Sequence, residues 1–289
     1  MTIDDPRSAT GSAAHVAHET EDKAGEARHS RVMQVLGRFG DICYGVIHIV
    51  VAVLTVRLIF GRPGHEVDQK GAVATIAAQP FGEVVLWFVA IGLVAFGIWQ
   101  LLMATTGFAY VHDRGGRIRK RIGTGGRAVA VLFIAVSTFR LLVSSSAGKS
   151  SNGESQTFTA KLMSVTGGRL LVGAVGIGIV IAAGVIAWRG IQRKFVEDLD
   201  LSRVSAKSAR LTKLLGSIGF AAKGVVYAIV GVLILVAAIQ FNPKRAVGLD
   251  GALRTLAGQP LGVGLLVVVA LGLAAYGGYC FFEARCRRS

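Results

Sequence analysis

Charged residues are scarce in this chain of 289 residues, and the shortage argues against a soluble fold. Asp, Glu, Lys and Arg together supply 17% of the residues, whereas hydrophobic residues supply 52%. Soluble domains are nearer about a quarter charged. We therefore expect an integral membrane protein.

Cysteine is equally scarce. The three cysteines, Cys43, Cys280 and Cys286, form an odd set without CxxC spacing. This pattern favours neither a disulfide framework nor a zinc site. The first 39 residues are polar and contain no early apolar core, so we expect no cleavable signal peptide and a first membrane helix that directs its own insertion.

Motifs that carry chemistry are also missing. We find no metal-binding cluster, no paired carboxylates on a helix and no Ser-His-Asp pattern, and the GTGG stretch at 123–126 lacks the Lys-Ser/Thr of a phosphate loop. The sequence therefore predicts no enzyme activity, no cofactor and no metal. A net charge of +15 invites a nucleic-acid role, but the basic residues are scattered between apolar runs and no binding motif accompanies them.

Long apolar runs are what the chain does contain. A helix needs about 20 mainly apolar residues to cross the hydrocarbon layer. Six runs come near this length, at 42–60, 82–103, 127–143, 168–188, 219–241 and 261–282. We predict an all-α polytopic membrane protein with six transmembrane helices, preceded by a disordered cytoplasmic tail over residues 1–29.

The distribution of Lys and Arg predicts the orientation. Most of the basic residues outside the runs lie in the N-terminal tail, in the second and fourth connections and in the C-terminal tail. Positive charge marks the cytoplasmic side. We expect a multi-pass plasma-membrane protein with both termini in the cytoplasm and a basic face that attracts anionic lipids.

The chain repeats itself. Residues 71–100 align without gaps with residues 251–280, and nearly half of the positions are identical. LGRFGDICYGVIH at 36–48 likewise matches LGSIGFAAKGVVY at 215–227. A more diverged middle copy keeps Gly168 and Gly178 where the first has Gly82 and Gly92. We predict three parallel helical-hairpin repeats, at 30–110, 111–195 and 196–284, before a basic tail at 285–289. A pseudo-threefold axis along the membrane normal could relate them.

Three motifs carry a resemblance to a known family. They are G-x-x-G-x-x-x-x-G, Gln-Pro-x-Gly and G-L-x-A-[FY]-G, and the match covers nearly all of residues 36–284. The chain resembles the domain of unknown function 1206 family of actinobacterial membrane proteins, whose members carry this two-helix unit three times. The resemblance implies a membrane location and six helices, and it implies no activity.

The Gln-Pro-x-Gly motif opens two apolar runs. We interpret it as the corner where the chain re-enters the membrane, with proline in the first helical turn. The glycine would allow the hairpin partner to approach closely. The middle copy reads Val-Thr-Gly-Gly at 165–168, which puts its equivalent packing in doubt. The motif residues are Gln79, Pro80, Gly82, Gln259, Pro260 and Gly262.

Two further segments leave alternatives open. Residues 30–40 and 209–219 set apolar against basic residues at helical spacing. They form either short helices lying in the membrane interface or extended starts of the membrane helices. The polar stretch at 144–155 is expected to be a flexible loop.

Ionisable residues inside the runs are the candidate functional groups. His48 lies deepest and could relay protons or simply pair within the bundle. Lys223, Arg57 and Arg140 lie nearer helix ends, where their long stems can reach the headgroups. Asp41 and Glu83 are explained as partners of helix N-terminal dipoles.

Two functions fit this pattern. The preferred one is a non-catalytic structural or interaction protein that binds another membrane protein, itself or lipid, since stripes such as Ala174, Gly178 and Ala182 suit close helix packing. The alternative is a small-solute or ion transporter or channel along the repeat axis. A transport pathway needs several polar groups near mid-membrane, and the sequence offers few beyond His48.

Overall fold

A computed structural model describes residues 31–61, 64–108, 113–143 and 151–287. The predicted tail at 1–29 lies outside the described residues. Six long helices are apolar enough to span a membrane, and the residues described form no strand. The long helices are α2 (Arg31–Ile59), α4 (Gly82–Thr106), α5 (Arg114–Val143), α7 (Gly168–Ile191), α8 (Ala206–Ile239) and α10 (Gly262–Cys286).

The six predicted spans are confirmed, and several helices begin earlier than the apolar runs. Helices α2 and α8 run without a break through the segments where a separate interfacial helix was an alternative. Ser205 caps α8, since its hydroxyl accepts a hydrogen bond from the amide of Ser208. Both segments are therefore extended starts of membrane helices.

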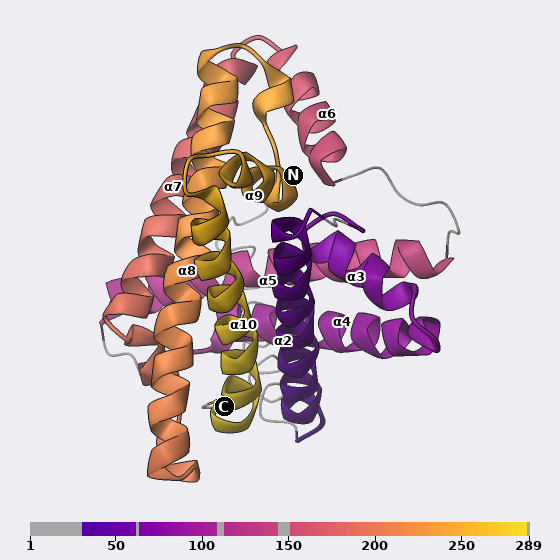
Figure 1. Cartoon of the computed structure of the whole chain (residues 1–289). Coiled ribbons are helices and arrows are strands. Elements are labelled where there is room, and N and C mark those ends of the chain that lie inside the picture. Colours follow the sequence, from indigo (N-terminus) through magenta and orange to yellow (C-terminus); the bar gives the residue numbers. More distant parts are fainter. Residues whose placement is uncertain (1–30, 62–63, 109–112, 144–150, 288–289) are drawn as a thin grey trace, which may run out of the picture.

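The long helices pack as three pairs that join neighbouring repeats. These pairs are α2 with α10, α4 with α5, and α7 with α8. In each pair the first helix of one repeat packs on the second helix of another, as a pseudo-threefold arrangement requires. The pairs are steeply inclined to one another, and α4 and α5 lie across α7 and α8 in Figure 1.

Packing within the repeats is unequal. Helices α2 and α4 form a packed hairpin, and so do α8 and α10, but α5 and α7 do not pack along each other. The space around equivalent glycines differs in the same way. A Cβ added to Gly40 of α2 would clash with Gly92 and Phe96 of α4, whereas the equivalent Gly126 of α5 has open space around it. The middle hairpin is therefore open.

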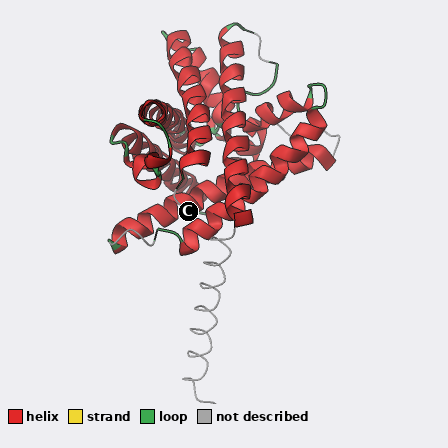
Figure 2. Ribbon diagram, turned by 90° about the horizontal axis from the view of Figure 1, so that it is seen from below, coloured by secondary structure: helices red, strands yellow, loops and turns green. Residues whose placement is uncertain are grey.

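Three short helices cover one end of the bundle: α3 (Gln69–Ala77), α6 (Ser151–Met163) and α9 (Leu249–Ala257). The expectation of a loop over 144–155 is wrong for residues 151–155, which begin α6; residues 144–150 lie outside the described part. We call this the capped end and the opposite end, which carries most Lys and Arg, the basic end. Figure 2 shows the helices joined by short loops. Parallel repeats are expected to place their three short helices, α3, α6 and α9, at the same end of the bundle.

The Gln-Pro-x-Gly corner differs from its prediction in detail. Pro80 lies in the turn before α4, two residues ahead of its first residue Gly82, so it is not in the first helical turn. Phe81 adopts a left-handed conformation with φ of 62°. A side chain at Gly82 would strike the carbonyl oxygens at the end of α3, so the glycine admits α3 and not the hairpin partner α4.

The middle copy forms the same corner without the motif. The amide of Gly168 donates to the carbonyl of Val165 over 2.8 Å, which matches the 2.8 Å bonds from Gly82 to Gln79 and from Gly262 to Gln259. Gly167 supplies the left-handed residue, with φ of 79°. The middle repeat is therefore equivalent at its corner and differs in its hairpin.

Candidate functional site

Four charged side chains meet inside the bundle near its basic end. Arg127 of α5 donates to Glu283 of α10 over 3.1 and 3.2 Å and to Asp41 of α2 over 3.3 Å. Arg287, just after α10, donates to Asp41 over 2.8 Å and to the amide oxygen of Gln100 over 3.3 Å. We call these five residues the ion-pair network. It ties all three repeats together.

The two carboxylates of the ion-pair network are deeply buried, and its two arginines are partly buried. Asp41 and Glu283 are 0% and 5% exposed. Removing charges from water is costly unless they are paired and hydrogen-bonded, and two guanidinium groups here face two carboxylates. The Arg127 guanidinium also lies 5.0 Å from the ring centroid of Phe96. Burial lowers the pKa of Arg287, but nearby Asp41 and Glu283 outweigh it and raise that pKa above its usual value.

A lysine surrounded by aromatic rings lies next to this network. Lys223 is halfway along α8, and its ammonium donates to the hydroxyl of Tyr44 over 3.1 Å. The same ammonium lies 4.0 Å from the ring centroid of Tyr276 and 5.7 Å from that of Tyr227. His48 contacts the rings of Tyr44 and Tyr276 at centroid distances of 4.4 and 4.8 Å. We call these five residues the lysine-tyrosine cluster.

His48 is held in one tautomer. Its Nδ1 lies 2.9 Å from the carbonyl oxygen of Tyr44, one turn earlier in α2. A carbonyl only accepts, so Nδ1 carries the proton and donates. The Nε2 atom is therefore the acceptor in the neutral ring, and the ring is fixed among the tyrosines.

The buried polar residues occupy equivalent positions in the repeats. The alignment that pairs Gly40 with Gly126 and Gly219 also pairs Asp41 with Arg127 and Phe220. Three and seven residues further along, it pairs Tyr44 with Lys223 and His48 with Tyr227. Contacts between equivalent positions, such as Asp41 with Arg127 and Tyr44 with Lys223, indicate that these first helices turn the same face toward a common centre.

The predicted candidates are only partly brought together. His48 and Lys223 share the lysine-tyrosine cluster, whereas Arg57 and Arg140 are exposed elsewhere. The expectation that Lys223 reaches toward the headgroups is wrong, because the side chain is buried and 7% exposed. Asp41 is not a helix-start residue either, since α2 begins ten positions earlier at Arg31. Glu83 does lie in the first turn of α4.

Sequence reasoning missed the other charged members of the ion-pair network. Arg127 and Glu283 fall at the edges of apolar runs, where charged residues usually face water or headgroups. The repeat alignment held a usable signal, since Asp41 and Arg127 stand at the same repeat position with opposite charge. Glu283 and Arg287 have no such signal, because their pairing depends on where α10 ends.

A second polar group closes the capped end. Asp250, at the start of α9, is 2% exposed. It accepts hydrogen bonds from the amide of Val67 and from the side chain of Asn152 in α6, each over 2.8 Å. Lys70 of α3 pairs with Glu154 of α6. All three repeats therefore meet at the cap as they do in the ion-pair network.

No metal centre accompanies these groups in the part of the chain that the structure describes, where no three His, Cys, Asp or Glu side chains gather as ligands would. The buried polar groups are mainly the cations of Arg and Lys, the phenol groups of Tyr and the carboxylates of Asp and Glu. They can bind a charged solute, exchange ion-pair partners or hold the repeats together.

Comparison with known proteins gives the family. The model of the family described as Domain of Unknown Function (DUF1206) matches three times, at residues 39–107, 122–193 and 218–287. The uncharacterized protein YxxB of Bacillus subtilis (strain 168) is 31% identical over 250 residues, which cover 86% of this chain and 88% of that protein. No solved structure matches significantly. The chain is therefore a member of the domain of unknown function 1206 family, and each of its three repeats is one copy of the family's domain.

Proposed function

We propose that this protein is a transporter of a small anionic solute, which binds at the lysine-tyrosine cluster and crosses along the pseudo-threefold axis. The observation that carries the proposal is the set of buried polar side chains at equivalent repeat positions. Ionisable groups inside a membrane protein are costly and usually functional. Repeat-built transporters place their sites at repeat interfaces near mid-membrane.

The sequence alone favoured a structural or interaction protein because polar groups near mid-membrane were few. The structure adds buried polar groups to His48: Tyr44, Tyr227 and Tyr276 lie around the ammonium of Lys223, and His48 contacts the ring of Tyr276. Tyrosine hydroxyls can donate to a solute, and a lysine contributes charge without fixed geometry.

The charges favour an anion. In their ordinary states, Arg127, Arg287 and Lys223 outnumber the carboxylates of Asp41 and Glu283 by one. No ion pair of Lys223 with a carboxylate occurs among the described residues, and its hydrogen-bond partner is a tyrosine. An uncompensated cation in a low-dielectric interior attracts a negative solute strongly.

Polar contacts close both ends of the proposed path. The ion-pair network lies toward the basic end, and Asp250 with its partners lies at the capped end. Ion pairs and hydrogen bonds can be exchanged, whereas tight apolar packing resists rearrangement. The open α5–α7 hairpin adds room for movement, because a Cβ added to Gly126 or Gly178 would meet open space. Both positions are glycine, so the two helices could also approach closely. We assign the basic end and both termini to the cytoplasm.

Flux measurements test the proposal. The full chain is reconstituted in liposomes, and solid-supported membrane currents are recorded on exposure to phosphate, sulfate, acetate, lactate and chloride. We expect current with at least one anion, a loss of tenfold or more in Lys223→Met, and partial recovery in Lys223→Arg. Arg140→Gln is the matched control, because Arg140 is an exposed cation in the last turn of α5, away from the lysine-tyrosine cluster. Absence of current for every anion, with a known anion transporter active in the same liposomes, contradicts transport.

A second candidate rests on a different observation. Ala174, Gly178 and Ala182 form an exposed stripe on α7, and a Cβ added to Gly178 would meet nothing within 4 Å. A stripe of small residues permits close helix association. A non-catalytic interaction protein would use this stripe to bind a second copy or another membrane protein. Gly178→Leu should then abolish a complex recovered from mild detergent, while anion current is absent.

A further inference from the structure

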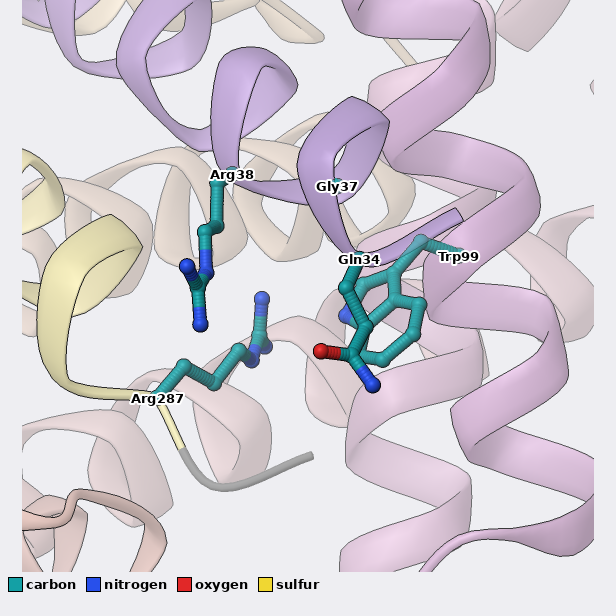
Figure 3. Close-up of a pocket in the computed structure, with 5 residues that line it drawn as sticks. All are labelled: Gln34, Gly37, Arg38, Trp99 and Arg287. Carbon is teal, nitrogen blue, oxygen red and sulfur yellow. The ribbon is translucent and has the colours of Figure 1, made fainter. Parts of the chain in front are cut away.

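A narrow cleft opens at the basic end beside the ion-pair network. Gln34, Gly37 and Arg38 of α2, Trp99 of α4 and Arg287 line it. Figure 3 shows the guanidinium groups of Arg38 and Arg287 and the indole edge of Trp99 turned toward its middle. Three elements that are distant in sequence therefore place their polar groups around one small space.

The lining of the cleft consists mostly of hydrogen-bond donors. Arginine donates and does not accept, and so does the indole nitrogen of tryptophan. No carboxylate lines the cleft. Arg287 is already held by Asp41 and Gln100, but no ion pair of Arg38 with a carboxylate is found among the residues that the structure describes.

Trp99 supplies the most specific signal. The residue is 3% exposed, yet its Nε1 atom donates to no acceptor within the described residues. A buried donor without a partner costs about 1–3 kcal/mol. The indole can lie against α2 only because residue 37 is glycine, since a Cβ there would come within 2.9 Å of the ring. The sequence thus positions an unpaired donor in the same cleft as two cations.

The position of the cleft fits the depth of headgroups. The first span begins at Gln34, and Arg287 directly follows the last span, which ends at Cys286. Tryptophan and arginine are favoured at this boundary, where the bilayer presents phosphate groups. Two guanidinium groups can also bind phosphate oxygens in pairs, which a lysine cannot do.

We propose that the cleft between Arg38, Trp99 and Arg287 binds a phosphate group, carried either by an anionic phospholipid or by a soluble phosphate compound. Arg38 and Arg287 neutralise the charge, and the Trp99 indole donates the third hydrogen bond. This proposal does not depend on transport, because it concerns the rim of the bundle and not the lysine-tyrosine cluster.

Fluorescence of Trp99 reports on the cleft directly. The other two tryptophans, Trp87 and Trp188, are exposed and can be replaced by phenylalanine. The purified full chain is titrated with inorganic phosphate in neutral detergent. In a second arm, nanodiscs of neutral glycolipid receive increasing phosphatidylglycerol. We expect a saturable change in Trp99 emission, and the arm in which it occurs identifies the source of the phosphate.

Variants decide whether the cleft is responsible. Arg38→Gln should weaken binding about tenfold, because it removes one charge-assisted contact. Trp99→Phe keeps the ring and loses the donor, so retained radiolabelled phosphate or co-purified lipid should fall severalfold. Arg57→Gln, an exposed cation at the other end of α2, should leave binding unchanged. Each variant is first checked for unchanged thermal unfolding. No emission change in either arm, or binding by Arg38→Gln and Trp99→Phe equal to that of the parent, overturns the proposal.

Discussion

The first and third hairpins are closed, and the middle hairpin is open. In the closed hairpins glycine brings the two helices together, as Gly40 does against α4 and Gly219 against Tyr276 of α10. In the middle hairpin, Gly126 and Gly178 remain in the sequence, but a Cβ added to either would meet open space. Asp198 still bridges its helices at the basic end, binding Lys120 of α5 and Arg189 of α7. The middle repeat thus retains the residues of a closed hairpin without the contact.

This difference suggests that the middle hairpin has a second, closed arrangement. Two packed hairpins form a frame. In the third, α5 packs on α4 and α7 packs on α8, and the ion pairs of Asp198 link α5 to α7 at the basic end. Proteins that switch usually do so through elements with few buried contacts. Each of the following experiments compares a substitution in one part of the molecule with a matched substitution elsewhere.

The largest effect should come from the charge that ties the open repeat to the frame. Arg127→Gln leaves Asp41 and Glu283 with one buried guanidinium between them. Breaking such a pair costs about 3–5 kcal/mol. The free energy of unfolding, measured by steric trapping in bicelles, should fall by this amount. Arg119→Gln, an exposed residue on the same helix, should change it by less than about 0.5 kcal/mol. Equal losses in both variants would show that the network is not stabilising.

The next experiment compares equivalent glycines. Gly40→Leu forces a side chain into packed backbone, and overpacking costs about 1–3 kcal/mol or more. Gly126→Leu meets open space and should leave stability nearly unchanged, apart from a small gain in helix propensity. Thermal unfolding of both variants in one detergent measures the difference. Similar destabilisation by Gly126→Leu would mean that α5 and α7 are packed in the membrane.

Crosslinking asks whether the open hairpin closes. In a chain whose three native cysteines are replaced by alanine, cysteines are placed at positions 126 and 178. We expect a disulfide to form slowly, and faster when a transported anion is present. The matched pair at 40 and 92 should crosslink faster, because these positions already touch and the two packed helices need to shift only slightly to admit the added side chains. If the pair at 126 and 178 never crosslinks, the middle hairpin has no closed arrangement and the suggestion is wrong.

The smallest effect concerns the corners. Gly167→Ala places a side chain at φ of 79° with open space around it, so the cost is backbone strain alone, about 1 kcal/mol. Phe81→Gly and Leu261→Gly relieve the same backbone strain, but glycine also raises the conformational entropy of the unfolded chain. The two effects oppose each other, so stability should change by less than about 0.5 kcal/mol. The three unfolding midpoints test the equivalence of the corners. A neutral Gly167→Ala would show that the middle corner relaxes.

The architecture was largely predictable because hydrophobic length and repeated glycines act locally. Six spans, three parallel repeats and the family follow from these patterns. The short helices α3, α6 and α9 were not foreseen. A nine-residue helix such as α3 is too short to be stable alone and depends on the cap that covers it.

The candidate site was predictable only in part. His48 and Lys223 were found because charge inside an apolar run is conspicuous. The ion-pair network was missed because Arg127 and Glu283 lie at the edges of apolar runs, where charged residues usually face water, and because the meeting of its members depends on helix inclination. The open hairpin was signalled only by the divergence of the middle copy, because Gly126 and Gly178, which would close it, are still present.

The contact between Asp41 and Arg127 has a consequence for the three copies of the repeat. These residues stand at the same place in two copies of one unit, and Phe220 stands there in the third. Three separate identical hairpins would set three aspartates, or three arginines, around their axis and repel one another. Opposite charges require that the copies have different sequences, as they do within this one chain. The buried ion pair is therefore specific to copies that have diverged, and it commits each copy to its own position in the ring.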